Sequence, residues 1–177
     1  MTEAVCYIGL GANLHQPVAQ LQAALSHLQQ LPHSKLTAVS SFYSSRPMGP
    51  QDQPDYVNAV AQISTALSPE ALLDQLQRIE LEQGRQRKDE RWGPRTLDLD
   101  ILLFGDRQIN TARLTIPHYG MKQREFVLYP LAEIAPQLVL PCGTVLTALL
   151  QQTPLNGLHK LPALAAADTL CHLAQPD

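Results

Sequence analysis

Cysteine clusters, long apolar runs and a leader-like N-terminus are all missing from this sequence. Its three cysteines, Cys6, Cys142 and Cys171, are widely spaced and form no CxxC pair, which argues against a disulfide framework and against a zinc site. No apolar run approaches the roughly 18 residues of a membrane-spanning helix, and no basic segment precedes a short apolar one. We therefore expect a cytoplasmic protein with no membrane partner.

Positive charge is also scarce overall, although one stretch concentrates it. The formal net charge is −3 and aromatic residues make up 5% of the chain, so nucleic acid is not an expected partner. Five of the 13 basic residues nevertheless fall within Gly84–Phe104: Arg85, Arg87, Lys88, Arg91 and Arg95. Charge gathered in this way suits a small anionic ligand better than a long polyanion.

The second half of that stretch, Thr96–Phe104, alternates like a β-strand. The alternation predicts that Leu97, Leu99, Ile101 and Leu103 face one way and that Asp98, Asp100, Leu102 and Phe104 face the other. Same-face side chains lie about 6.5–7 Å apart along a strand, a spacing at which two carboxylates can converge on one or two hard cations.

A DxD pair alone is more typical of a strand end or turn than of a metal site. Here Asp98 and Asp100 interrupt an otherwise apolar strand, where carboxylates are costly to desolvate unless a positive partner neutralises them. The basic residues just before them would meet phosphate oxygens. We therefore predict a site for Mg²⁺ and a polyphosphate.

The remaining patterns predict an α+β domain with a ferredoxin-like βαββαβ core, in which helices pack on an antiparallel sheet, followed by a small mixed segment. The expected core elements are strands at 5–10, 36–43, 56–63 and 96–104, a helix after Pro17 that Pro32 closes, and a helix from Ser68 to Gly84. A short return strand at 107–110 would follow, then a helix at 123–132 that Pro130 would break or kink, and a helix at 144–152 capped by Thr144. We expect a single domain over residues 1–160, a tail of uncertain order at 161–177, and a monomer.

Three smaller features allow more than one interpretation. Gly9 and Gly11 suggest a tight strand-to-helix turn, because the third glycine of a dinucleotide-binding fingerprint is missing. Tyr56 and Asn58 share a strand face, which fits either a half-exposed surface or a platform for a flat heterocycle. Gln77 and Glu80 lie together off the apolar stripe of their helix.

The string RWGPRTLDLDIL resembles the signature of the 6-hydroxymethyl-7,8-dihydropterin pyrophosphokinase family, a group of folate-pathway enzymes. The positions that fit are Arg91, Gly93, Pro94, Arg95, Asp98, Leu99, Asp100, Ile101 and Leu102. The likeness extends from about Tyr7 to about Leu149. It includes Ser41-Phe42-Tyr43, the Pro-rich loop from Gly49 to Pro54, Tyr56, Asn58, Gln77, Glu80 and Pro117-His118-Tyr119.

The resemblance implies transfer of a pyrophosphoryl group from ATP to the hydroxymethyl oxygen of 6-hydroxymethyl-7,8-dihydropterin, with AMP as the second product. It implies that Asp98 and Asp100 hold two Mg²⁺ ions, and leaves open whether either one also activates the hydroxyl. Arg85 and Arg95 would meet phosphate oxygens during the reaction, while Arg87 and Trp92 would lie on a loop that closes over both substrates. The implied pterin contacts are Ser45, Pro47, Met48, Gly49, Tyr56, Asn58, Trp92 and Phe126. The implied ATP contacts are Gln77, Glu80, Arg87, Trp92, Arg95, Ile101, Arg113, Thr115, His118, Tyr119 and Arg124.

The chain departs from the family pattern in a few places. Family members usually have Thr at the position of Ser45 and a non-basic residue at that of Arg46, and the tail beyond about Leu155 has no clear counterpart. We expect no fused dihydropteroate synthase or dihydroneopterin aldolase, because no segment is long enough.

Two alternatives compete with the enzyme. One is a ferredoxin-like module that stacks RNA bases, which would use the basic loop with Trp92 and the exposed Tyr56. It predicts interleaved aromatics and a basic domain, neither of which the composition provides. The other is an ordinary kinase or nucleotidyltransferase with the same two-carboxylate site. The sequence has no Walker loop, which removes the commonest kinase class but not the others.

Overall fold

The computed structural model describes residues 3–13, 16–45, 56–83, 97–118, 121–155 and 157–161, with the side chain of Gln123 excepted. Its main sheet is antiparallel, in the order β5-β1-β4-β3-β8, and β2 also pairs with β4. The elements of the core are β1 (Ala4–Ala12), α1 (Pro17–Gln29), β2 (Ser34–Val39), β3 (Tyr43–Ser45), β4 (Tyr56–Thr65), α2 (Pro69–Glu82) and β5 (Asp98–Phe104). They are followed by β6 (Ile109–Asn110), β7 (Thr115–Ile116), the 3₁₀ turn η1 (Met121–Gln123), α3 (Glu125–Ile134), α4 (Leu146–Gln152) and β8 (His159–Lys160).

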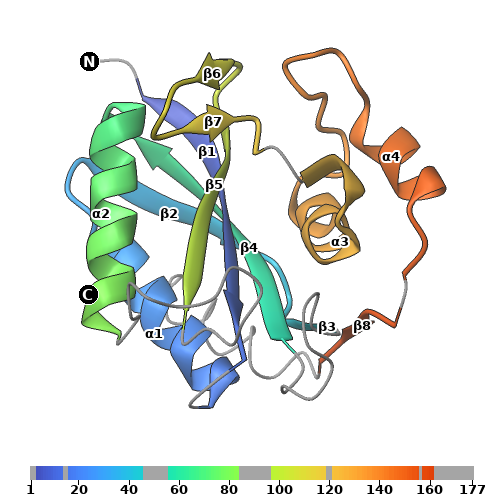
Figure 1. Cartoon of the computed structure of the whole chain (residues 1–177), viewed down its shortest axis with the longest axis horizontal. Coiled ribbons are helices and arrows are strands. Elements are labelled where there is room, and N and C mark those ends of the chain that lie inside the picture. Colours follow the sequence, from blue (N-terminus) through green and yellow to red (C-terminus); the bar gives the residue numbers. More distant parts are fainter. Residues whose placement is uncertain are drawn as a thin grey trace.

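Helices cover both faces of the sheet (Figure 1). The α1 and α2 helices pack on one face through leucines such as Leu25 and Leu76, and α3 and α4 pack on the other through Leu128 and Leu146. Burial of apolar side chains on both faces supplies the main favourable term for folding. The prediction of an α+β, ferredoxin-like βαββαβ core with an added C-terminal segment is confirmed.

Local sequence explains where the first two helices begin. Pro17 and Pro69 occupy the first helical turns, where the missing N–H has no helical partner to lose. The hydroxyl oxygen of Ser68 accepts a hydrogen bond from the Ala71 amide at 3.2 Å, which caps α2. The α2 helix ends at Glu82, before Gly84, which lies outside the described residues.

The single strand predicted at 36–43 is wrong, because two strands, β2 and β3, occupy that region. The side chain of Ser40 accounts for the break. Its hydroxyl oxygen accepts the Val60 amide hydrogen at 2.9 Å, a donor that a backbone carbonyl would take in an unbroken ladder. Ser40 is fully buried, so this exchange keeps the Val60 amide satisfied while the chain changes direction.

The prediction that Gly9 and Gly11 form a turn is also wrong, since both lie inside β1. A second correction concerns β5. Tyr7 pairs with Leu103 and Ile8 with Ile101, so Leu102 is an extra residue, a β-bulge. Because the bulge reverses the alternation, Leu103 packs with Leu102 on the α3 face and Phe104 joins the opposite core, against the predicted faces.

The C-terminal part also departs from expectation. The α3 helix continues through Pro130 to Ile134, and the residue preceding α4 is Val145, so Thr144 is not its cap. The predicted return strand begins only at Ile109 and pairs with β7. Beyond the predicted elements, β8 adds a short strand beside β3. Within the described residues, every helix is too short or too polar to cross a membrane.

Candidate active site

Two rows of paired residues run across the sheet from β5 to β4. Asp98 pairs with Gly11, which pairs with Asn58, while Asp100 pairs with Gly9. Residues that pair directly point to the same face of a sheet. The two aspartates and Asn58 therefore share the α3 face. The aspartates on β5 are separated from Asn58 on β4 by the width of β1, about 10 Å over two strand spacings.

Between them, β1 presents Gly9 and Gly11 on this face, and neither has a side chain. We call these two positions the bare strip. Gly9 and Gly11 are partly exposed, although Ile8 and Leu10 beside them are buried. A Cβ atom at Gly11 would lie 3.1 Å from the amide oxygen of Asn58, and one at Gly9 would lie 3.3 Å from a methyl group of Leu102. Leu102 therefore packs over Gly9, whereas among the described residues Asn58 alone approaches the Cβ position at Gly11, which leaves Gly11 as the less covered part of the strip between Asp98 and Asn58. The sequence held this signal, a glycine at alternate strand positions, but a turn explained it equally well.

The Asp98–Asp100 pair fits a hard cation that shares its ligands with a phosphate. The side chain of Asp98 is partly buried and that of Asp100 is 49% exposed. The described ranges contain no cluster of three or more His, Cys, Asp or Glu residues suited to a metal. Mg²⁺ commonly takes one or two carboxylates and completes its octahedron with water and substrate phosphates, so two carboxylates are sufficient.

Glu80, on α2, forms a hydrogen bond with the backbone of β5. Its carboxylate oxygen Oε2 accepts the amide hydrogen of Leu99, the residue between the two aspartates, at 2.8 Å. Glu80 is only 5% exposed, whereas Gln77 is exposed, so the prediction that the two lie together off the core stripe is wrong for Glu80. This hydrogen bond fixes β5 at the level of the two aspartates.

His118 lies next to Asp100. Its Nε2 atom is 3.9 Å from Oδ2 of Asp100, and its amide donates to the carbonyl oxygen of Leu102, the bulge residue, at 3.0 Å. Burial and the positive charge of Arg124 lower the pKa of His118 to about 4. The imidazole is therefore neutral at pH 7, and its contact with Asp100 is not an ion pair.

The opposite end of the bare strip is formed by β3 and β4, and α3 contacts both of these strands. The Asn58 side chain is buried and donates a hydrogen bond from Nδ2 to the Ser45 hydroxyl oxygen at 2.6 Å. Tyr56 pairs with Ser45 and is partly exposed. Phe126, on the first turn of α3, lies with its ring centroid 5.7 Å from the guanidinium carbon of Arg124. The predicted shared face of Tyr56 and Asn58 agrees with the register of β4.

Arg113 forms a separate group against α2. Its Nη2 donates to Asp74 at 2.7 Å and to Gln77 at 3.5 Å, and hydrogen bonding to Asp74 raises the pKa of the guanidinium. Thr115 is exposed on β7. Ile101 is 3% exposed, so a ligand beside it would meet backbone rather than side chain.

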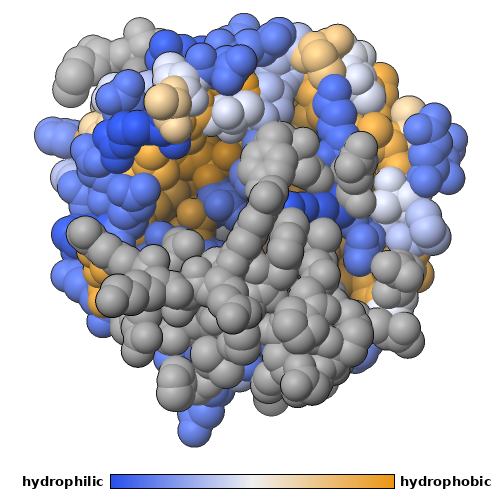
Figure 2. Space-filling view, in the orientation of Figure 1, coloured by the Kyte–Doolittle hydropathy of each residue, from blue (hydrophilic) through white to orange (hydrophobic). Residues whose placement is uncertain are grey.

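In Figure 2 hydrophobic residues reach the surface between α2 and β5, with hydrophilic residues along the helix side.

Several predicted site residues lie outside the described residues. They are Pro47, Met48 and Gly49 in the Pro-rich loop, Arg85, Arg87, Trp92 and Arg95 in the basic segment, and Tyr119. Their predicted roles stay predictions.

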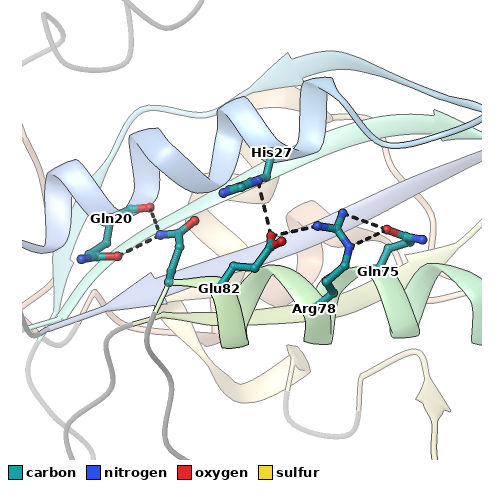
Figure 3. Close-up of polar contacts among 6 residues, drawn as sticks. Gln20, His27, Gln75, Arg78 and Glu82 are labelled. Atoms are coloured by element: carbon teal, nitrogen blue, oxygen red, sulfur yellow. Dashed lines mark hydrogen bonds and ion pairs between the residues drawn. The ribbon is translucent and has the colours of Figure 1, made fainter.

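The helix that leads into the basic segment is fixed to its neighbour. Nε2 of Gln83 donates to the carbonyl and side-chain oxygens of Gln20 on α1, at 3.0 and 2.8 Å. Figure 3 shows His27 of α1 directed at Glu82, which also binds Arg78; the two distances are 4.0 and 2.8 Å. These contacts hold the C-terminal end of α2, the last described element before residue 97.

Known proteins resemble this chain over most of its length. A family model described as 7,8-dihydro-6-hydroxymethylpterin-pyrophosphokinase matches residues 7–136. The chain belongs to this pyrophosphokinase family. A Haemophilus influenzae relative named 2-amino-4-hydroxy-6-hydroxymethyldihydropteridine pyrophosphokinase is 62% identical over 155 residues, which cover 88% of this chain and 96% of that protein. A Pseudomonas aeruginosa protein of the same name is 56% identical, with the same coverage of both chains.

A solved structure has the same fold as this chain. The Plasmodium falciparum HPPK-DHPS protein, solved with pteroate, superposes with a TM-score of 0.67 over 85% of this chain at 15% sequence identity. The matched part is 42% of that longer chain, so this chain spans less than half of it. At this identity the likeness concerns the fold alone.

The two described cysteines of this pyrophosphokinase chain are expected to differ sharply in reactivity. Hydrogen bonds from Lys122 at 3.0 Å and with Thr144 at 3.2 Å lower the pKa of the exposed Cys142 thiol to about 6, and burial raises that of Cys6 to about 12. Because the thiolate is the nucleophile, iodoacetamide should label Cys142 at pH 7 while Cys6 stays unlabelled in the folded protein. Peptide mass spectrometry after timed labelling measures both.

The pH dependence provides the check. The labelling rate of Cys142 should rise through a midpoint near pH 6, and Lys122→Met should move that midpoint upward. A midpoint above pH 8 in the unaltered protein would contradict the assigned contact.

Proposed function

We propose that this protein transfers a pyrophosphoryl group from ATP to the hydroxymethyl oxygen of 6-hydroxymethyl-7,8-dihydropterin, forming the pterin diphosphate and AMP in folate biosynthesis. The observation that carries the proposal is the row Asp98–Gly11–Asn58. With Asp100, which pairs with Gly9, this row supports a carboxylate pair suited to Mg²⁺ at one end of the bare strip and an amide suited to a heterocycle at the other.

The described residues suggest how the two substrates would be arranged. The pterin would lie between Tyr56 and Phe126, with the buried amide of Asn58 and the Ser45 strand reading its edge. An aromatic ring between two aromatic side chains is favoured by several tenths to about 1.5 kcal/mol beyond area burial. The triphosphate would extend along the strip toward Asp98 and Asp100.

Phosphoryl transfer depends mainly on positioning and on charge stabilisation, and the chain offers groups for both. Two Mg²⁺ ions held by Asp98 and Asp100 would neutralise the triphosphate. Glu80 keeps the intervening strand in place through the Leu99 amide. Neutral His118 would offer a hydrogen bond rather than a charge, and Arg124 a cation for phosphate oxygens. Arg85 and Arg95 are proposed to meet the transferring group.

Other parts of the proposal follow from the same chemistry. Gln77, Arg113 and Thr115 would contact the nucleotide beside α2, and Arg87 and Trp92 would cover the substrates when the basic segment closes, which excludes water as a competing acceptor. We further propose that the protein acts as a monomer in the cytoplasm, where ATP and Mg²⁺ are both abundant.

The nucleotide product tests the proposal directly. Purified protein is mixed with ATP, Mg²⁺ and 6-hydroxymethyl-7,8-dihydropterin, and the nucleotides are separated by chromatography. We expect AMP to form one-for-one with loss of the pterin. ADP would identify an ordinary kinase on the same scaffold, and neither product, with the protein shown to be folded, would favour a binding module.

A further inference from the structure

A polar cluster on the α3 side of the sheet joins the two walls of the proposed pterin site. The carboxylate of Glu133, on the last turn of α3, accepts hydrogen bonds from the Ser41 amide at 2.8 Å and the Ser41 hydroxyl at 2.9 Å. It also accepts one from the Tyr43 hydroxyl at 2.6 Å, and Nζ of Lys160 lies 3.7 Å away. We call these four residues the Glu133 cluster.

The Glu133 cluster extends the row Asp98–Gly11–Asn58 across the sheet. Asn58 of β4 pairs with Gly11 of β1 on one side and with Tyr43 of β3 on the other. Tyr43 in turn pairs with Lys160 of β8. The residue that Glu133 binds is therefore the direct neighbour of the amide proposed to read the pterin. Leu161 adds a backbone hydrogen bond to Phe42 at 2.8 Å, so β8 holds the outer edge of β3.

The same carboxylate is two helical turns from Phe126. Seven residues correspond to about 10 Å along an α-helix and return to nearly the same face. The cluster thus connects β3, whose Ser45 pairs with Tyr56, to the helix that carries Phe126. Apolar packing of α3 through residues such as Val127 and Leu131 is non-directional, whereas hydrogen bonds to a carboxylate fix position and orientation.

We infer that Glu133 is a positioning residue that sets the separation of the pterin-binding walls, with Tyr43 as its partner in the sheet. This inference rests on the proposed function. The charge state agrees with it. Burial would raise the pKa of Glu133, but hydrogen bonds from Tyr43 and Ser41, with the charge of Lys160, outweigh burial and lower it. Burial and the hydrogen bond to Glu133 raise the pKa of Tyr43, so the phenol stays a donor.

Substitution of the two partners tests the inference. Glu133→Ala should raise the KM for the pterin about tenfold and leave the KM for ATP within about twofold, since hydrogen bonds to a charged group are lost on one side of the site only. Tyr43→Phe removes a single hydrogen bond and should raise the pterin KM by about threefold. The loss in the double variant should be smaller than the product of the two single losses, because both act through one contact.

A matched control is Glu3→Ala. Glu3 also accepts a serine hydroxyl, that of Ser64 at 2.9 Å, but at the opposite end of β1 and β4. It should leave both KM values unchanged. Amide hydrogen exchange at Ser41 reports the contact itself and should become faster in Glu133→Ala than in the control.

The outcomes separate the two claims. A wild-type protein that forms no AMP would refute the proposed function. With AMP formed, an unchanged pterin KM in the variants, or equal increases for pterin and ATP, would overturn the positioning role. If Glu133→Ala does not fold, Tyr43→Phe decides, because it removes one hydroxyl and keeps the ring that packs on Lys160.

Discussion

Asp98→Asn and Asp100→Asn should each lower the rate of AMP formation by at least about 100-fold and leave the fold intact. Electrostatic groups at a phosphoryl-transfer centre act on charge that develops in the transition state, and removal of one such group typically costs about 100- to 1,000-fold in rate. Asparagine keeps the shape of the side chain but loses the negative charge that holds Mg²⁺. Initial rates at saturating ATP and pterin, over a Mg²⁺ titration, measure the effect.

Stability should change little in these variants. Both side chains are at least partly exposed, and asparagine removes the repulsion between two nearby carboxylates. Thermal unfolding therefore separates loss of function from loss of structure. Asp106→Asn is the matched control, because Asp106 is an exposed aspartate in the turn just after β5. Near-normal turnover in either site variant would remove that residue from the proposed metal site.

The sequence predicted this strand and its carboxylates because two independent signals agreed there. Period-two alternation placed Asp98 and Asp100 on one face, and the register of β5 against β1 agrees. The family signature pointed to the same residues, and the family itself is confirmed by the match over residues 7–136.

The features that sequence patterns missed depend on contacts between distant segments. The hydroxyl of Ser40 breaks a strand only because Val60 lies opposite it. Leu102 becomes a bulge only through the pairing of β5 with β1. Glu80 is buried because Leu99 offers it an amide hydrogen from another element. Neither propensity nor periodicity along one segment contains that information.

Gly9 and Gly11 also show that a pattern along one segment can fit two different structures. A glycine is compatible with a turn or with a strand that something approaches closely, and a single sequence does not distinguish the two. The pairing register does. It places Gly11 between Asp98 and Asn58, so the feature that predicted a turn is the bare strip of the proposed site.

Gly11→Val should therefore abolish most activity while the sheet persists. Valine has a higher strand propensity than glycine, so the backbone of β1 should tolerate it. Its side chain, however, would fill the strip, and its Cβ would lie 3.1 Å from the Asn58 oxygen. Because Gly11 lies between the carboxylate and amide ends, the substitution would separate the pterin hydroxyl from the phosphate it attacks. Displacements of about 1 Å in such reactions can cost about 100-fold, and we expect at least that loss in kcat/KM.

Two further variants make this last prediction specific. Val5→Ile also enlarges a side chain on β1 and on the same face, but at its far end, where Val5 is 44% exposed; its activity should be normal. Gly11→Ala adds the Cβ alone and should fall between the two. Thermal unfolding within a few degrees of wild type, together with lost turnover, would locate the substrates over β1. Full activity in a folded Gly11→Val protein would mean that the substrates do not cross this strand, and the carboxylates and Asn58 would then belong to separate sites.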